Sequence, residues 1–240
     1  SSLFIGSSAG DDIASGTQNT FIGYEAGANT TSGSSNTFLG YRAGFVNTTT
    51  GSNTFIGALS GDANTSGIDN TFLGLQSGSA TNSGSHNTFV GKNAGRLNDT
   101  GDNNTFIGNN SGDILNGTSS DNVFIGAYSG SNIASANNLL YIENTNSNSP
   151  LVYGNFAADS ISINGTLSVG SNYTFPADAP STNEILKYNG TNLIWDTDAS
   201  SASQWTTSGT DIYYNTGEVG ISTVTPSYDL EVAGGIGITG

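Results

Sequence analysis

The first stretch with residue types suited to chemistry is GSSAG, from Gly6 to Gly10. It fits the Gly-x-Ser-x-Gly nucleophile elbow, in which the central serine attacks an acyl carbon with the help of a histidine. The phrase recurs along the chain, and the positions equivalent to Ser8 contain no serine: Glu25, Arg42, Leu59, Gln76, Asn93, Asn110 and Tyr128. The only histidine, His86, occupies a loop position that holds serine, aspartate or asparagine in other copies. We therefore expect no catalytic residue and predict that the protein is not an enzyme.

Two further patterns resemble cofactor or metal sites. GIGITG, from Gly235 to Gly240, fits the Gly-x-Gly-x-x-Gly fingerprint but lacks the helix that a dinucleotide site requires. Acidic residues recur in the loops, where carboxylates can bind Ca²⁺, but their spacing matches neither an EF-hand nor a calcium-binding nonapeptide repeat. These residues are Asp11, Asp12, Asp62, Asp69, Asp99, Asp102, Asp113 and Asp121. We predict no cofactor, with Ca²⁺ bound at most occasionally.

These patterns belong to a larger one, a repeat of 17 residues. Its core reads Asn-Thr-Phe-aliphatic-Gly, as in NTFIGYEAG from Asn19 to Gly27, and a second glycine follows the first by four residues. Eight of the 11 phenylalanines occupy one position of the repeat. They are Phe4, Phe21, Phe38, Phe55, Phe72, Phe89, Phe106 and Phe124, the last of them one residue late. Such a period is too short for a helical hairpin or a propeller blade and is typical of one coil of a β-solenoid.

Stacking of coils explains why part of the repeat is constant. Strands of successive coils lie about 4.8 Å apart, so identical residues fall on top of one another and form ladders of phenylalanine, aliphatic residues and asparagine. The rungs include Ile22, Leu39 and Ile56, and Asn19, Asn36 and Asn53. Side chains alternate between faces along a strand, so threonine and phenylalanine point in opposite directions. The two variable residues after the first glycine are expected near solvent, unstacked.

The interior of such a coil is small. Burying one phenylalanine and one aliphatic residue returns only a few kcal/mol, whereas ordering the backbone costs about 1–2 kcal/mol per residue. Both faces of the strand carry apolar residues, so one face fits inside the coil and the other is expected to meet a copy of the chain. We predict a homotrimer with its axis along the rod, because threefold symmetry gives every coil an equivalent contact.

The composition excludes several classes of partner. Four basic residues against 19 acidic ones give a net charge of −15, so the chain lacks the basic patch that nucleic-acid binding requires. An anionic membrane surface would repel it, and no apolar run approaches the roughly 20 residues that span a bilayer. The absence of cysteine excludes a disulfide framework and a thiolate metal site. We expect neither nucleic-acid binding nor membrane insertion.

The period ends near residue 137, and short strands separated by turns follow. In order, the later segments are LLYIEN…SPLVYGNF…ISINGTLSVG, then YTFPADAP…NEILKYNGTNLIWDTD with a hairpin signal at Asn189-Gly190, then WTTSGTDIYYNTGEVGISTVTPSYDLEVAGGI. The repeats resemble those of bacterial and phage tail-fibre-domain proteins and, more loosely, the coils of trimeric autotransporter adhesin heads. The later segments are similar to modules that follow such repeats. The resemblance covers nearly the whole chain and implies a trimeric, extended β fibre used for attachment.

The sequence thus predicts an all-β chain with four parts. A homotrimeric β-solenoid, or β-roll, of about eight 17-residue coils spans residues 1–137 and is followed by small irregular β modules. These are a β transition segment over 138–170, a connector over 171–204 and a C-terminal β module over 205–240.

We expect a structural fibre segment of a phage tail, a contractile injection device or a bacterial surface appendage. It would lie outside the cell and attach to a cell-surface glycan or protein receptor, with Tyr24, Tyr41 and Tyr128 as candidate contact residues.

Two alternatives stay open. An ice-binding or lattice-binding solenoid would need a flat exposed face of threonines, whereas a fibre would place them inside the coil or at a subunit seam. A depolymerising, glycan-binding tailspike would need paired carboxylates in a cleft, and the acids recur at no constant repeat position.

Overall fold

A computed structural model describes residues 1–114, 117–169, 173–174, 176, 180–182, 184–197, 205–208, 211–214, 219–221 and 230–232. The chain divides into two compact units, Ser1–Thr166 and Leu167–Gly240. The strands of the first unit form one 11-stranded sheet in the order β1 to β11. The described strands of the second unit form four separate two-stranded sheets.

The elements of the first unit are β1 (Leu3–Ile5), β2 (Thr20–Ile22), β3 (Thr37–Leu39), β4 (Thr54–Ile56), β5 (Thr71–Leu73), β6 (Thr88–Val90), β7 (Thr105–Ile107), β8 (Val123–Ile125), β9 (Leu139–Ile142), β10 (Val152–Asn155), the 3-10 turn η1 (Phe156–Ala158) and β11 (Ser160–Ile163). Those described in the second unit are β12 (Ser168–Val169), β13 (Tyr173–Thr174), β14 (Glu184–Tyr188), β15 (Leu193–Thr197), β16 (Trp205–Ser208), β17 (Asp211–Tyr214), β18 (Val219–Ile221) and β19 (Leu230–Val232).

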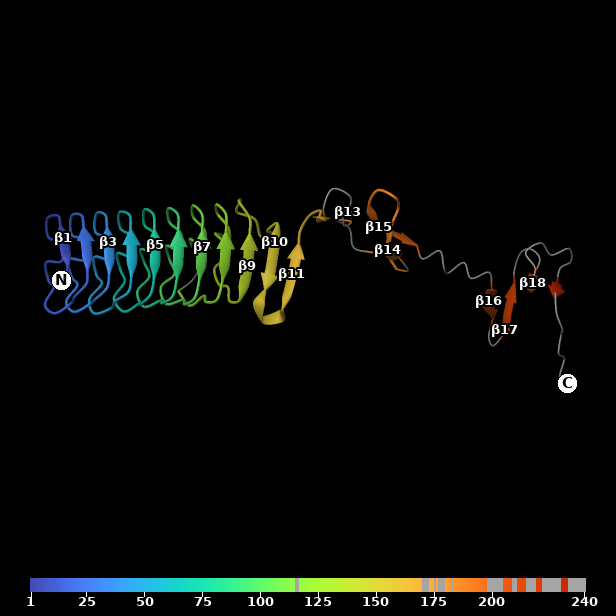
Figure 1. The fold of residues 1–240 in the computed structure, drawn as a ribbon, viewed down its shortest axis with the longest axis horizontal. Coiled ribbons are helices and arrows are strands. Elements are labelled where there is room, and N and C mark those ends of the chain that lie inside the picture. Colours follow the sequence, from blue (N-terminus) through green and yellow to red (C-terminus); the bar gives the residue numbers. More distant parts are fainter. Residues whose placement is uncertain are drawn as a thin grey trace. The chain divides into compact units, whose positions relative to one another are not determined.

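Strands β1 to β9 run parallel, with one strand in each coil, and form the solenoid (Figure 1). The register is constant, since Phe21 pairs with Phe38 and Phe38 with Phe55. One coil is a residue longer, because Phe106 pairs with Phe124. The prediction of an all-β fold with a β-solenoid of about eight turns of about 17 residues is confirmed.

Hydrogen bonds between coils continue around the loops. Beyond the strand, the amide of Arg42 donates to the carbonyl of Tyr24 at 2.9 Å. The amide of Gly44 donates in the other direction, to the carbonyl of Ser60 at 2.9 Å. Each coil therefore uses both neighbours to satisfy the backbone groups of its turns, as buried backbone groups require. The coil that is one residue longer keeps these bonds, since the amide of Tyr128 donates to the carbonyl of Asn109 at 2.8 Å.

A single stack of phenylalanine rings runs through the interior of the solenoid. The seven from Phe21 to Phe124 are fully buried. Between Phe21 and Phe106, neighbouring ring centroids are 4.7–5.0 Å apart and the planes lie within 3–8° of parallel. The stack ends at Tyr141, whose ring is tilted by 58° against that of Phe124. Because each aromatic contact adds about 0.5–1.5 kcal/mol to the burial of a ring, every coil depends on its neighbours for stability.

Asparagine forms a second, polar ladder inside the coil. Asn70, two residues before Phe72, is fully buried. Its Oδ1 accepts from the backbone amide of Asn87 at 3.0 Å, and its Nδ2 donates to the carbonyl of Gly84 at 2.8 Å. The same pair of bonds is made by Asn19, Asn36, Asn53, Asn87, Asn104 and Asn122. The amide supplies a donor and an acceptor at fixed geometry, which explains why this position is constant.

The two constant glycines of each coil are needed for different reasons. Gly91 has a φ of +139°, and a Cβ there would lie 2.3 Å from the carbonyl oxygen of Gly108 in the next coil. Gly95 has a φ of +58°, and its Cβ would lie 2.4 Å from the ring of Phe89. The first glycine lets successive backbones approach each other, and the second leaves room for the stacked ring.

Two further positions in each coil place residues other than glycine in the left-handed region, which the sequence did not reveal. One is the second variable residue, with φ of +57° at Leu59 and +60° at Tyr128. The other precedes the asparagine, with φ of +57° at Asp69 and +59° at His86. Asparagine, aspartate and histidine tolerate this conformation, but leucine and tyrosine incur about 1–2 kcal/mol. The bonds between coils therefore override local backbone preference.

Antiparallel pairing begins where the repeat ends. Strand β9 still continues the parallel stack, with Tyr141 opposite Phe124. Strand β10 then pairs antiparallel with β9, and β11 pairs antiparallel with β10. The sheet that begins in the solenoid thus runs on past residue 137 into the predicted transition segment.

In the second unit, β14 and β15 form an antiparallel hairpin around Asn189-Gly190. Gly190 has a φ of +97°, and the amide of Asn189 donates to the carbonyl of Asn192 at 3.0 Å. Strands β16 and β17 pair antiparallel, while β18 and β19 pair parallel. Residues 171–172, 175, 177–179, 183 and 198–204 of the predicted connector lie outside the described residues, as does the C-terminal module apart from β16 to β19.

Replacing Asn70 by Asp tests the amide ladder. The carboxylate keeps the side-chain shape but is charged, buried and unable to donate to Gly84, so the free energy of unfolding should fall by about 3 kcal/mol or more. Asn109→Asp makes the same charge change at an exposed position and should change it by less than about 0.5 kcal/mol. Urea denaturation at one protein concentration measures both. Equal losses would contradict a structural role for the ladder.

Candidate interaction surface

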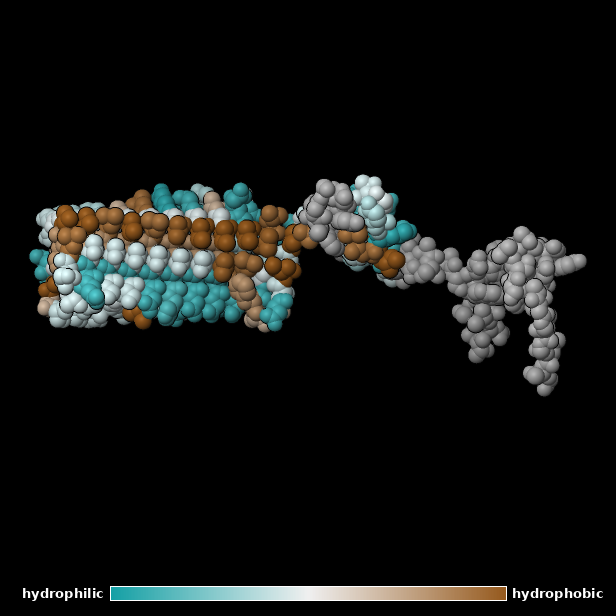
Figure 2. Space-filling view, in the orientation of Figure 1, coloured by the Kyte–Doolittle hydropathy of each residue, from teal (hydrophilic) through white to brown (hydrophobic). Residues whose placement is uncertain are grey.

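The outward face of the parallel strands carries one aliphatic side chain per coil. Phenylalanine points into the coil, so the alternation of side chains sends the next residue outward. These residues form what we term the aliphatic stripe: Ile5, Ile22, Leu39, Ile56, Leu73, Val90, Ile107, Ile125 and Ile142. They are half-buried or exposed, and Leu39 and Leu73 are 42% and 44% exposed. Figure 2 shows apolar residues as a continuous brown band along the solenoid.

A row of threonines lies on the same outward face, two residues before the stripe. It consists of Thr20, Thr37, Thr54, Thr71, Thr88 and Thr105, all half-buried or exposed. At the ends, Leu3, Val123 and Leu140 take the threonine position. The threonines therefore do not lie inside the coil, one of the two places expected for them in a fibre. Asparagine and phenylalanine occupy the inward positions instead.

Neither row contains a charged residue along strands β1 to β9. The chain as a whole has a net charge of −15, so its acidic residues lie outside these two rows. Long contiguous apolar bands are rare on soluble monomers and mark interaction sites. The outward face of β1 to β9 is therefore the candidate functional site.

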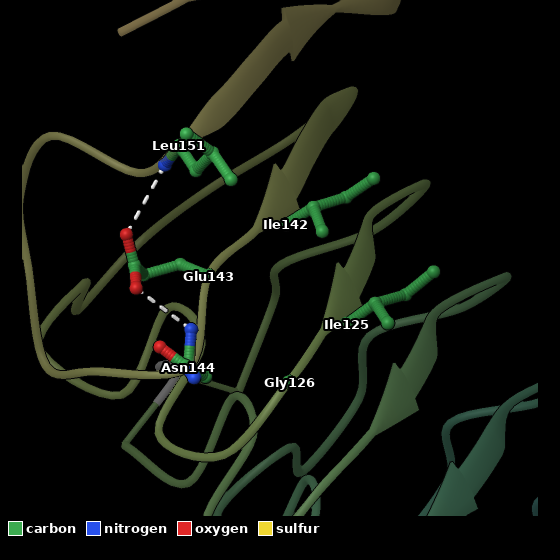
Figure 3. Close-up of a pocket in the computed structure, with 6 residues that line it drawn as sticks. All are labelled: Ile125, Gly126, Ile142, Glu143, Asn144 and Leu151. Carbon is green, nitrogen blue, oxygen red and sulfur yellow. Dashed lines mark hydrogen bonds between the residues drawn. The ribbon is translucent and has the colours of Figure 1, made fainter. Parts of the chain in front are cut away.

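At the C-terminal end of the stripe the surface is hollowed (Figure 3). The pocket is lined by Ile125, Gly126, Ile142, Glu143, Asn144 and Leu151. Leu151 stands just before β10 and is 54% exposed. The pocket forms because the chain leaves β9 in a loop and returns as an antiparallel strand, a connection that the repeating coils do not make.

Glu143 holds this loop closed. Its Oε1 accepts from the amide of Asn144 at 2.7 Å and from the hydroxyl of Thr145 at 3.1 Å, and its Oε2 accepts from the amide of Leu151 at 3.1 Å. Hydrogen bonding to the carboxylate, above all from the Asn144 amide, lowers the pKa of Glu143. The carboxylate thus positions Leu151 and has both oxygens engaged within the loop.

The candidate contact residues Tyr24 and Tyr41 lie among the variable residues after the first glycine. They were expected to be unstacked, but their ring centroids are 5.6 Å apart with planes at 8°. The constant register brings equal residues of neighbouring coils together here as well. Both are 49% exposed, and Tyr128 is 45% exposed. The pKa of Tyr24 is raised above its ordinary value, mainly by a hydrogen bond to Glu25.

Arg42 links acidic residues of two neighbouring coils beside these tyrosines. Its Nε lies 3.6 Å from Glu25 and its Nη2 lies 3.6 Å from Asp62. Its guanidinium also stands over the ring of Phe45, 4.0 Å from the centroid. Burial raises the pKa of Asp62, and the charge of Arg42 opposes that effect. This polar and aromatic patch is a second surface with side chains suited to binding.

The residues of the apparent catalytic motif are not brought together. Ser8 follows β1, whereas His86 precedes β6, so strands β2 to β5 lie between them. His86 is exposed and its Nε2 lies 3.5 Å from an oxygen of Asp69. In the part of the chain that the structure describes, no three residues among histidine, cysteine, aspartate and glutamate cluster as metal ligands. Occasional Ca²⁺ binding stays a prediction, and Gly235–Gly240 lies outside the described residues.

Three comparisons with known proteins, against family models, curated proteins and solved structures, gave no match for this chain. Among the described residues, no helix has the length and hydrophobicity to cross a membrane.

The lowered pKa of Glu143 predicts a pH-dependent loop. A carboxyl whose pKa is lowered on folding stabilises the loop at neutral pH, and this contribution is lost as the pH falls through the folded pKa. The amide NMR signal of Leu151 should therefore titrate with a midpoint below the ordinary value of 4.5. The titration should disappear in Glu143→Gln and persist in Glu25→Gln. A titration midpoint at or above 4.5 would contradict the role of Glu143 in holding the loop closed.

Proposed function

We propose that the chain is a structural segment of a homotrimeric fibre that mediates attachment to a cell-surface receptor. The observation that carries this proposal is the aliphatic stripe, an uncharged apolar band along about eight turns of a chain with a net charge of −15. Exposed apolar area of this length favours association. The chemistry and spacing of the band select the partner.

A second copy of the chain fits this band best. Neighbouring coils repeat at 4.7–5.0 Å, measured between stacked ring centroids, so two stripes can match at every coil at once. A helical or irregular partner would match only a few rungs. Strongly negative copies repel one another over most of their surface, and the uncharged face is where they can meet.

Threefold symmetry suits one narrow face per copy. The aliphatic stripe and the threonine row give each copy two adjacent contact lines, and around a threefold axis each line meets one neighbour. With the axis along the solenoid, coils at equal height contact one another. Burial of the stripe adds apolar area to coils whose own interior holds one ring and one or two asparagine amides, which a small core needs.

A stack of hydrogen-bonded coils provides length and stiffness, the properties that an attachment fibre needs. We place it outside the cell, on a phage tail, a contractile injection device or a bacterial surface appendage, in agreement with the resemblance of its repeats. The variable residues after the first glycine present diverse side chains on a constant backbone. Tyr24, Tyr41 and Tyr128 are among them, and we assign this surface to a glycan or protein receptor, with no enzymatic role.

Leu73 and Leu75 are a matched pair for testing the stripe. They belong to one coil and are 44% and 43% exposed, but only Leu73 belongs to the stripe. Leu73→Asp should convert the trimer to monomers, because three carboxylates would meet at one height, whereas Leu75→Asp should still assemble. Light scattering should give three times the 24.4 kDa chain mass for the wild type and for Leu75→Asp. A wild-type mass of one chain would overturn the proposal.

The outward-facing threonine row supports a second function, binding to ice or another ordered lattice. Thr37 and Thr71 are exposed, and the row repeats at the spacing of the coils beside an apolar row. This function needs a free face, so it competes with the trimer. Thermal hysteresis of a monomeric wild-type protein, lost in Thr71→Tyr, would favour it. A trimer that gives no hysteresis would reject it.

A further inference from the structure

The aliphatic stripe carries nearly the same residue at every coil. It therefore does not determine the axial register, which is the choice of which coil of one copy lies beside which coil of the next. If the outward faces pack against one another, as proposed above, a displacement by one coil restores nearly every contact and costs only the end rungs. The stripe varies little, from Ile56 to Leu73 to Val90 in successive coils. An exchange of Ile for Leu conserves volume, and an exchange of Ile for Val removes only one methylene group. A feature outside the repeat is therefore needed to specify the register.

The pocket at the C-terminal end of the stripe is such a feature. It depends on the antiparallel return of the chain at Val152, which pairs with Ile142. The steps from β1 to β9 are all parallel and offer no comparable connection. Figure 3 shows Ile125 and Ile142 projecting in the same direction from neighbouring strands, with Leu151 on the side of the loop. The stripe therefore ends in a hollow rather than in another rung.

The lining of the pocket selects an apolar occupant. Three of its walls are the side chains of Ile125, Ile142 and Leu151. The Glu143 carboxylate beside them already accepts three hydrogen bonds from within the loop. A cation would have to displace those bonds, whereas a branched aliphatic side chain needs none of them. The pocket is also continuous with the stripe, because Ile125 and Ile142 belong to both.

We propose that Leu151 of each copy enters the pocket of the next copy around the axis and so sets the axial register of the fibre. This inference rests on the proposed homotrimer. Leu151 is a wall of its own pocket and is also 54% exposed, so it can contact two copies at once. Such a contact closes on itself in a cyclic trimer. A copy displaced by one coil would leave the pocket empty and Leu151 in water.

Mixed trimers of two chain lengths test this register. Deleting residues 37–87 removes three whole coils, β3 to β5, and joins Asn36 to Thr88 in the pattern of the repeat. If the pocket sets the register, full and shortened copies align at Thr105, and their N-terminal coils are offset by about 14 Å. If the first coils set it, the copies align at Thr20 instead.

Cross-linking distinguishes these alignments. The chain has no cysteine, so an introduced cysteine is the only site of reaction. One pair of copies carries Thr105→Cys and another pair carries Thr20→Cys, and cross-linking shows in each case whether the two equivalent positions lie close together. The two lengths are refolded together and treated with a bis-maleimide shorter than the offset, and the mixed product is identified by its mass. We expect the mixed product at position 105 to exceed that at position 20 by at least about tenfold, the factor that burial of one leucine supplies.

Leu151→Ala in both copies should bring the two mixed products to similar amounts. The control is Leu97→Ala, at a leucine that is 39% exposed and lies outside the stripe. This variant should keep the preference for position 105. Equal products in the wild type, or a preference for position 20, would overturn the inference while leaving the trimer intact. Monomeric mass with no mixed product would instead overturn the proposed function. If Leu151→Ala fails to assemble, the wild-type mixture alone decides between the two alignments.

Discussion

The rise from one coil to the next is the constraint on which the whole solenoid depends. Strands in a sheet lie about 4.7–4.9 Å apart, and stacked phenylalanine rings from Phe21 to Phe106 are separated by 4.7–5.0 Å. One rise therefore satisfies the backbone hydrogen bonds and the ring stack together. The longer coil between Phe106 and Phe124 keeps this rise, with the ring centroids 5.0 Å apart and the planes at 23°. The interior thus requires a constant rise between coils, which a coil with one extra residue can also satisfy.

The interior is half polar, and its polar groups are also used between coils. Asn70 and its equivalents bond to the strand and to the return loop of the next coil. Where serine stands before the second glycine, as at Ser60, its hydroxyl donates to the carbonyl of Phe72 in the next coil at 3.2 Å. Such bonds fix each turn from outside the coil, which is why Leu59 and Tyr128 can hold a left-handed backbone. Stability is shared along the stack, as in other repeat proteins.

The outward face follows from the same geometry. A strand of three residues that buries its phenylalanine must present the residues on either side of it to the outside. The aliphatic stripe is therefore an unavoidable product of the Thr-Phe-aliphatic pattern, and an uncharged band on a strongly negative chain is suited to contact between copies. The end of the sheet differs, since the antiparallel return at β10 adds Leu151 and the Glu143 loop to the stripe. In the proposed trimer, the repeated coils would supply the area of the contact, and the end of the repeat would fix its axial position.

The amino-acid sequence by itself determined the coil length, the strand in each coil and the rungs of the ladders. Stacking demands identical residues at a fixed period, so the period is visible in the order of residues. The left-handed residues before Asn70 and after Gly57 could not be read in this way, because their conformation is imposed by neighbouring coils and their side chains vary. The stacking of Tyr24 on Tyr41 needed the same register. Only the tertiary structure decided that threonine faces outward with the stripe, because this depends on which face the closed coil turns inward. Only the tertiary structure also decided that the loop after Ile142 brings Leu151 beside the stripe, because this depends on where the chain reverses.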